Sequence, residues 1–305
     1  MKTENRKPKT ENRLLSPVVK TQVLKYSPGM IQPVEEQMAQ EAPLALFLQG
    51  EIYQHLLYLP GLEKELALGF LLTSGIIEGV EDITELEFYP PGDQSPSCPS
   101  VRVTLTKDVT KWGDYSSWLP LALLQGRSEA QQRLAATRMP TPSSPVKVRI
   151  QVDNLLALMA RLPQRQKIFS QTGATHAIGI ADPIQGEIIL SAEDVGRHNA
   201  FDKVIGQALL QKIPLYDKIA LLSGRASYEM VLKATRAGIP LLSAVSAPTF
   251  LALKLAEFQG ITLVGFARND KMNIYTHAER LHGLGDNVSL SKRSDLSTPP
   301  SMMHL

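Results

Sequence analysis

The stretch Ser191-Ala-Glu-Asp-Val-Gly-Arg-His-Asn-Ala-Phe-Asp-Lys203 joins a predicted buried strand to a predicted helix. The apolar run Ile188–Leu190 before it is typical of the end of a strand, and Val204–Leu210 after it is typical of a helix. Acidic, basic and amide side chains lie between them, with Gly196 to permit an unusual backbone angle. Because the first N–H groups of a helix are unpaired and attract anions, this junction is a candidate binding site.

A purely local interpretation of the same stretch stays open. Asn199 or Asp202 could cap the helix, and Glu193 could form an ion pair with Arg197. A short motif does not by itself distinguish capping from ligand binding, so its context in the rest of the chain has to decide.

Length and composition exclude several classes of protein. The 305 residues suffice for one large or two modest domains, and a net charge of +2 does not indicate a broad nucleic-acid-binding surface. Cys98 is the only cysteine, which excludes a disulfide framework and a cysteine-rich zinc site within one chain. The polar, basic beginning and the lack of a long apolar stretch predict no secretory signal and no membrane span, hence a soluble cytoplasmic protein.

The first half predicts a smaller α+β domain with its linker over residues 18–146, after a disordered tail at residues 1–17. Strands are expected at Val18–Tyr26, within Ala45–Leu59, at Asp82–Tyr89 and at Val101–Thr106, with a helix over Leu62–Thr73 that stops at Gly75. Prolines and serines at Met139–Pro145 indicate a linker between the domains.

Strands alternate with helices over residues 147–286, before a second disordered tail at residues 287–305. The predicted strands are Ala177–Ala181, Glu187–Ser191, Lys218–Leu222, Leu241–Val245 and Ile261–Phe266. The predicted helices are Val152–Leu162, Gln164–Gln171, Phe201–Leu210, Ala226–Ala237 and Thr249–Phe258. This alternation predicts an α/β fold with a largely parallel sheet that helices cover on both faces.

Polar clusters follow the predicted strands, at the end of an open sheet where ligands usually bind. The clusters are Thr172–His176, Glu193–Asn199, Ser223–Glu229, Ser246–Thr249 and Ala267–Lys271. They hold groups suited to phosphates, namely the cations Arg197, Arg225, Arg268 and Lys271 and the hydroxyls Ser223 and Ser246. They predict a phosphate-bearing, nucleotide-like ligand, although the glycine fingerprints of Rossmann and P-loop proteins are missing.

Three further side chains have more than one interpretation. His176 and His198 could serve acid–base chemistry, or each could hydrogen-bond a loop. The zinc deaminase pattern is excluded, because neither the required glutamate nor a Pro-Cys-x-x-Cys motif is present. Cys98 lies among prolines and serines without a neighbouring cation, which favours an inert surface thiol.

A set of motifs in both halves of the chain is typical of one known family. In the second half the motifs are Thr172–Ala177, Glu193–Asn199, Asp202–Gly206, Ser223–Glu229, Ala237–Pro240, Ser246–Thr249, Leu263–Phe266 and Asn273–Thr276. In the first half they are Glu41–Leu44, Leu66–Leu71 and Gly75–Ile77. Through these motifs the sequence resembles the FdhD family of formate dehydrogenase accessory proteins over residues 41–89 and 172–282.

The resemblance implies a cytoplasmic homodimer whose C-terminal domain is a cytidine-deaminase-like α/β/α sandwich without the zinc site. It implies a sulfurtransferase that takes sulfur from a cysteine desulfurase and passes it to the bis-molybdopterin guanine dinucleotide molybdenum cofactor for formate dehydrogenase. The family's cofactor-binding segment corresponds to Phe266, Ala267, Arg268, Asn269, Asp270 and Lys271. The remaining candidate cofactor-binding residues are Thr175, His176, Arg197, His198, Asn199, Ser223, Arg225 and Ser246.

One departure from the family concerns the sulfur itself. The family carries sulfur on a Cys-x-x-Cys loop between its domains, and residues 107–145 of this chain contain no cysteine. The role is not transferred to Cys98, so whether this protein is an enzyme stays open. The alternatives are a non-catalytic cofactor chaperone and a nucleotide-binding regulatory protein.

Overall fold

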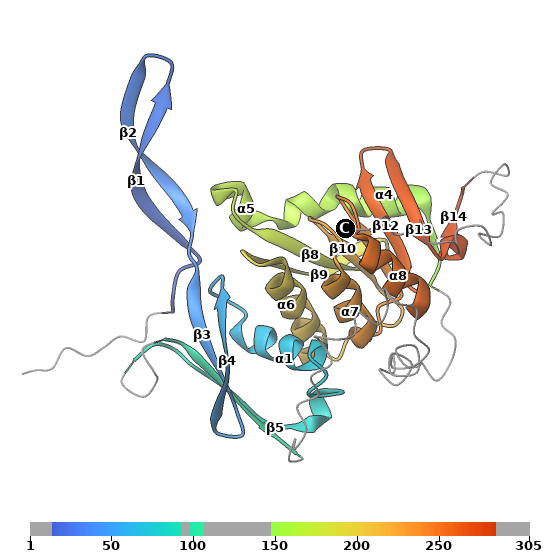
Figure 1. Cartoon of the computed structure of the whole chain (residues 1–305), viewed down its shortest axis with the longest axis horizontal. Helices are drawn as coiled ribbons and strands as arrows, with labels where there is room; N and C mark the ends of the chain where they lie inside the picture. Colours follow the sequence, from blue (N-terminus) through green and yellow to red (C-terminus); the bar gives the residue numbers. More distant parts are fainter. Residues whose placement is uncertain (1–13, 93–97, 107–147, 285–305) are drawn as a thin grey trace, which may run out of the picture.

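The structure is a computed structural model that describes residues 14–92, 98–106 and 148–284. The N-terminal part combines strands with helix α1 (Glu63–Thr73), as Figure 1 shows. Its four-stranded sheet has the order β4 (Glu51–Tyr58), β3 (Ala42–Leu48), β6 (Ser100–Leu105) and β5 (Ile83–Tyr89). Strands β1 (Val18–Ser27) and β2 (Met30–Ala39) pair only with each other, and this hairpin projects from the molecule (Figure 1).

A six-stranded sheet forms the C-terminal part, in the order β13-β12-β11-β10-β8-β9. The strands are β8 (His176–Asp182), β9 (Glu187–Asp194), β10 (Ile219–Leu222), β11 (Leu241–Ala244), β12 (Thr262–Arg268) and β13 (Lys271–Thr276). The helices are α4 (Val152–Arg161), α5 (Lys167–Thr172), α6 (Arg197–Leu210), α7 (Tyr228–Ala237) and α8 (Phe250–Gln259). The short elements are η1 (Val80–Asp82), η2 (Leu162–Arg165), η3 (Ala278–Arg280) and the paired strands β7 (Ile150–Gln151) and β14 (Leu281–His282).

The sheet is mixed, so the expectation of a largely parallel sheet is wrong. Strands β10, β11 and β12 are parallel, whereas β8 and β13 run antiparallel to their neighbours. The links β8–β9 and β12–β13 are too short to hold a crossover helix and can only form hairpins. Because β9 is antiparallel to β8, it runs in the same direction as β10. The ends of β9 to β12 and the beginning of β8 therefore meet at one edge, as predicted.

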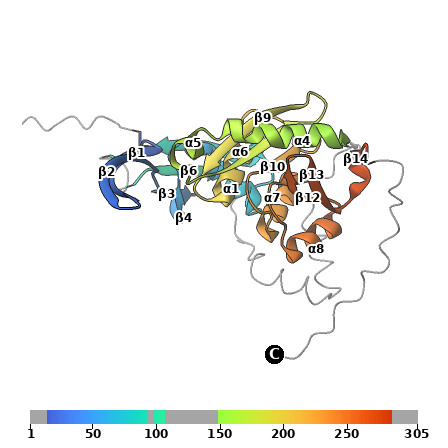
Figure 2. The same ribbon diagram turned by 90° about the horizontal axis from the view of Figure 1, so that it is seen from above.

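Helices cover both faces of this sheet (Figure 2), which confirms the predicted α/β/α sandwich. Helices α6, α7 and α8 pack on one face together with α1, and α4 packs on the other. The first face forms a single core with the N-terminal sheet, since Leu66 of α1 and Val103 of β6 belong to the same cluster as Phe201 of α6. None of the described helices is long and apolar enough to cross a membrane.

Helices α1 and α6 touch through their backbones. A Cβ atom placed on Gly69 would lie 1.8 Å from the carbonyl oxygen of Asp202, and one on Gly206 would lie 1.9 Å from that of Glu65. Only glycine permits so close an approach at these two positions. Beside this crossing, Thr73 and Lys233 bind the buried Asp202 carboxylate, with Lys233 Nζ 2.6 and 2.8 Å from its two oxygens.

Several element boundaries differ from expectation. Strand β2 was not predicted, because Glu35, Glu36 and Gln37 interrupt its apolar pattern; the Pro28-Gly29 turn that precedes it was the usable signal. Helix α6 begins at Arg197 instead of Phe201, so Arg197, His198 and Asn199 form its first turn. Residues 1–13 of the tail predicted at residues 1–17, the linker and the tail over residues 287–305 lie outside the described residues, and the domain boundaries stay predictions.

The contact between α1 and α6 predicts that replacing glycine by alanine in either helix lowers stability, the reverse of the usual effect. Alanine normally stabilises a helix interior by about 1 kcal/mol relative to glycine. Gly69→Ala and Gly206→Ala should instead each destabilise the protein by about 3 kcal/mol, because the added Cβ forces the helices apart. Denaturant unfolding of the full chain would measure the change, with the exposed Lys64→Ala on α1 as the control. Unchanged stability in both glycine variants would contradict the packing described.

Candidate anion-binding site at one edge of the sheet

Backbone hydrogen bonds join the loops at the edge where β9 to β12 end. The N–H of Ala226 donates to the oxygen of Ala247 at 3.3 Å, and the N–H of Thr249 donates to the oxygen of Ala226 at 3.0 Å. The N–H of Phe266 donates to the oxygen of Ser246 at 3.2 Å. The β10–α7 loop, the β11–α8 loop and the end of β12 are therefore held side by side.

Ser223 links the end of β10 to the beginning of β8. Its Oγ accepts a hydrogen bond from the N–H of Ala177 at 2.9 Å, and its own N–H donates to the oxygen of Ala177 at 3.0 Å. The next residue, Gly224, lies against His176, since a Cβ there would be 3.3 Å from the imidazole Nδ1. The hydroxyl oxygen of Ser223 thus accepts a hydrogen bond within the fold, and its proton is left to donate to a ligand.

A cavity of about 400 Å³ opens beside these residues. It is lined by Gln166, Phe169, Gly173, Ala174, Thr175, His176 and Ser223. Its walls come from the start of α5 with the residue before it, from the loop between α5 and β8, from the beginning of β8, and from Ser223 after β10, so it lies at the predicted edge. Gln166 and Phe169 were not among the predicted site residues, because the short α5 sequence gives no signal of a binding wall.

Positive charge gathers around His176. Burial lowers the pKa of His176 first, and Arg197, Arg225 and His198 lower that pKa further, which places all three close to the imidazole. Burial also lowers the pKa of His198, whose ring is 3.3 Å from Glu229, and this carboxylate opposes the shift. Both histidines are therefore biased toward the neutral form, and Arg197 and Arg225 supply the positive charge around His176.

The Nε atom of Arg197 is buried and makes no hydrogen bond within the part of the chain that the structure describes. A buried donor without a partner is costly, and one beside a cluster of cations suits an anionic acceptor. Arg225 in the neighbouring loop is exposed to solvent. The arrangement can bind an oxyanion such as a phosphate.

The β12–β13 hairpin completes the edge with strained backbone. Phe266 and Asn269 both have left-handed backbone angles, with φ of 53° and 56°. Non-glycine residues rarely adopt this conformation, and when they do they often lie at functional sites. Within the described residues, no hydrogen bond or ion pair joins the side chains of Arg268 and Lys271 to the other loops.

The predicted site residues differ in exposure. Exposed to solvent are Arg225, Phe266, Arg268, Asn269, Asp270 and Lys271; half-buried are His176, Arg197, His198, Asn199, Ser223 and Ser246; buried are Thr175 and Ala267. The side chain of Ala267 packs into the core beneath the sheet, so only its backbone is left for a ligand. The described residues contain no cluster of side chains able to hold a metal ion.

Glu193 does not pair with Arg197, so the local interpretation of that ion pair is wrong. Its carboxylate accepts hydrogen bonds from the backbone N–H groups of Ile168 and Phe169, both at 2.8 Å, at the beginning of α5. It also accepts the hydroxyl of Thr175 at 2.7 Å. Glu193 therefore holds α5, which forms one wall of the cavity. Thr175 helps to orient the Glu193 carboxylate through its hydroxyl.

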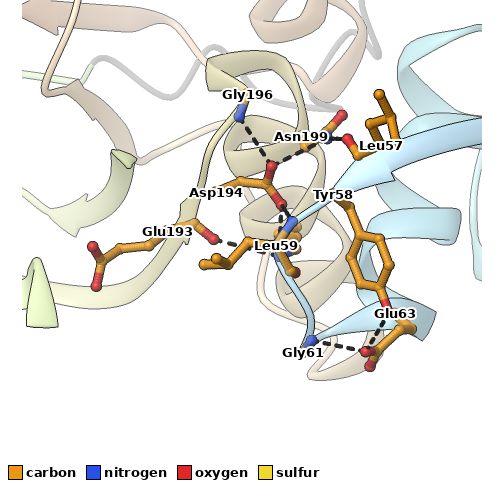
Figure 3. A network of polar contacts seen from close by, with 10 residues as sticks. Leu57, Tyr58, Leu59, Gly61, Glu63, Glu193, Asp194, Gly196 and Asn199 are labelled. Atoms are coloured by element: carbon orange, nitrogen blue, oxygen red, sulfur yellow. Dashed lines mark hydrogen bonds and ion pairs between the residues drawn. The ribbon is translucent and has the colours of Figure 1, made fainter. Parts of the chain in front are cut away.

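Asp194 connects the edge to the N-terminal part (Figure 3). One carboxylate oxygen accepts the N–H of Gly196 at 3.0 Å and the amide of Asn199 at 3.1 Å. The other accepts the N–H of Leu59 at 3.0 Å and lies 2.7 Å from Lys203 Nζ. Both ionic side chains are at most 1% exposed.

The same junction holds neighbouring groups in place. Asn199 also donates to the oxygen of Leu57 at 2.7 Å, and Lys203 donates to the oxygen of Leu59 at 2.6 Å. Neither Asn199 nor Asp202 caps α6, whose N-cap, Gly196, makes no side-chain hydrogen bond. The stretch from Ser191 to Lys203 thus has two roles. Asp194, Asn199 and Lys203 join the N-terminal and C-terminal parts, while Arg197 and His198 lie at the edge near His176.

Removal of one member of the buried pair should be far more harmful than loss of a surface pair. Lys203→Met leaves the Asp194 carboxylate buried beside no cation, which should cost about 3–5 kcal/mol of unfolding free energy. Asp194→Asn in the same chain should recover part of that loss, because it removes the unpaired charge. Denaturant unfolding of the single and double variants would measure both effects.

The exposed pair Lys20–Glu35, whose side chains are 61% and 53% exposed, provides the matched control. Lys20→Met should change stability by less than about 1 kcal/mol. If Lys203→Met were as mild as Lys20→Met, the buried pair would not hold the junction together.

Comparison with known proteins gives a consistent result. The family model described as FdhD/NarQ matches residues 39–282. The "Sulfur carrier protein FdhD" of Bordetella parapertussis is 36% identical over 273 residues, which are 86% of this chain and 94% of that protein. The protein of the same name from Mycolicibacterium paratuberculosis is 40% identical over 259 residues, which are 81% of this chain and 92% of its own.

A crystal structure from Desulfotalea psychrophila, of a protein assigned as a formate dehydrogenase accessory protein, has the same fold. Its TM-score is 0.67 at 25% sequence identity, with 87% of this chain and 99% of that chain covered. The motifs, the fold and the relatives agree, and the chain belongs to the FdhD/NarQ family.

Proposed function

We propose that this protein is a cytoplasmic accessory protein of formate dehydrogenase that binds the bis-molybdopterin guanine dinucleotide molybdenum cofactor at the described edge. The observation that carries the proposal is the convergence of Arg197, Arg225 and two histidines there, with the buried Arg197 Nε left without a partner in the described residues. A diphosphate of the cofactor would supply the missing acceptor. The residues that are present therefore fit the phosphate portion of such a ligand.

The edge residues would hold the cofactor in complementary ways. Arg197 and Arg225 would balance phosphate charge, while Ser223 would donate its hydroxyl proton. The exposed Arg268 and Lys271 on the β12–β13 hairpin would reach a second part of the ligand. The cofactor itself supplies the molybdenum chemistry that formate dehydrogenase uses, and the role of this chain is to bind and orient it.

The role in sulfuration is the open part of the proposal. Curated relatives are named sulfur carriers, yet the segment that carries the Cys-x-x-Cys loop in the family has no cysteine here. Cys98 acts on Tyr58 of β4: the pKa of that phenol is raised first by burial, then by Glu63, and to a smaller extent by Asp194 and Cys98. Absence of the cysteine pair favours the alternative of a cofactor chaperone without a sulfur-transfer step.

The family resemblance supports three proposed partners, namely formate dehydrogenase, a cysteine desulfurase and a second copy of the chain. The projecting β1–β2 hairpin supports an assembly, because a lone two-stranded hairpin is marginally stable in water. Leu24, Tyr26 and Ile31 lie on one of its faces and are 74%, 71% and 66% exposed. We propose that this apolar face is covered in the homodimer.

Binding of GDP, which represents half of the cofactor, tests the site. Loss of one charge-assisted phosphate contact costs about 1.5–3 kcal/mol, so Arg225→Ala or Arg268→Ala should weaken binding roughly 10- to 150-fold. Isothermal calorimetry on the full chain would measure the dissociation constants. Arg149→Ala is the control, because this exposed arginine precedes β7, away from the edge. Unchanged affinity in both site variants would place the nucleotide elsewhere.

Incubation with a cysteine desulfurase and cysteine should leave no stable functional persulfide on this chain. The chain has a single cysteine, so no second thiol is present to form the cysteine pair that carries sulfur in the family. Intact-mass analysis would detect an added sulfur atom, and complementation of an accessory-protein deletion would compare wild type with Cys98→Ser. The prediction fails if the wild type gains sulfur and restores formate dehydrogenase while Cys98→Ser does neither.

A further inference from the structure

Phe250 is a large apolar side chain that does not contribute to the core. It is the first residue of α8 and is 64% exposed, while its neighbours Ala252 and Leu255 on the same helix are fully buried. Lys254, one turn further along α8, places its Nζ 5.5 Å from the centre of the Phe250 ring. Because the ring stays largely exposed to solvent, its burial contributes little to folding stability, and an exposed ring beside a cation is suited to stacking on a ligand.

The backbone holds Phe250 at the edge that carries the anion site. The preceding residue, Thr249, caps α8 by accepting the N–H of Ala252, and its own N–H donates to Ala226. Ala226 directly follows Arg225 in the neighbouring loop. The position of Phe250 is therefore coupled by hydrogen bonds to the loop that carries one of the cations.

A second aromatic residue lies on the other side of the same loop. Phe266 is 37% exposed, and its N–H donates to Ser246 at 3.2 Å. Close packing fixes this contact, because a Cβ on Gly265 would lie 2.8 Å from the ring of Pro248. Two exposed aromatic residues thus flank the Ser246–Thr249 loop, next to cations that can bind phosphate.

We propose that Phe250 stacks on the planar heterocycle of the ligand whose phosphates bind the basic edge. This inference rests on the proposed nucleotide site and adds the residue that recognises the base. Phosphate contacts do not distinguish a nucleotide from inorganic pyrophosphate, whereas stacking on an aromatic ring requires a base. The cation–π contact of Lys254 with the Phe250 ring helps to hold that ring in place.

The test compares GDP with pyrophosphate on the full-length protein by calorimetry. Phe250→Ala should weaken GDP binding about 5- to 150-fold, the range expected when a stacking residue is removed, and leave pyrophosphate binding unchanged. Phe258→Ala is the matched control, since Phe258 lies in the last turn of the same helix and is 39% exposed. Phe250→Trp should keep GDP affinity, and its indole fluorescence should be quenched by GDP but not by pyrophosphate.

The outcomes separate this inference from the proposed site. If Phe250→Ala binds GDP as tightly as wild type, or if GDP leaves the fluorescence of Phe250→Trp unchanged, the stacking role is wrong and the anion site stands. Equal loss of GDP and pyrophosphate in Phe250→Ala would also overturn it, because that result indicates damage to the phosphate loops. Failure of the wild type to bind either ligand would overturn the proposed site, and the stacking role with it.

Discussion

The buried ion pair between Asp194 and Lys203 determines how the two parts of this chain meet. Each carboxylate oxygen of Asp194 has two partners, and they come from β4–α1 as well as from α6. Burial lowers the pKa of Lys203, and the adjacent carboxylate opposes that shift. A pair of this kind adds little net stability, yet either charge alone would be very costly. The pair therefore specifies one arrangement of the junction, and the first turn of α6, with Arg197 and His198, is placed by it.

The alternation of strands and helices was sufficient to predict the α/β sandwich and the edge where the polar clusters gather. Strand direction was predicted wrongly, because the alternation of strands and helices was extended to the link β8–β9, which is too short for a helix, and because strand β13 was not predicted. The β12–β13 turn contains only Asn269 and Asp270, and Asn269 adopts a left-handed angle that a propensity argument does not anticipate. The error in direction did not displace the site, because β8 begins at the same edge where β9 ends.

Residue types in the candidate site were easier to predict than their partners. Arg197, Arg225 and His176 were singled out from the sequence, and the structure brings them together. The roles of Glu193 and Thr175 were not predictable, because their partners on α5 are reached only through the fold. Phe250 was missed for a different reason: within an apolar helix sequence, an exposed phenylalanine looks the same as a buried one. Sequence reveals the chemistry that a chain carries, while exposure and pairing depend on distant segments.

The crossing of α1 and α6 has a consequence for biosynthesis. Gly69 and Asp202 are in backbone contact although more than a hundred residues separate them in the sequence. As the ribosome delivers the chain, α1 emerges with an apolar face that has no partner until α6 has followed. Such non-local contacts slow folding, because the intervening segment has to be closed into a loop before they form. During synthesis the apolar face of α1 therefore stays exposed until the C-terminal half, which contains α6, has been made and completes the core.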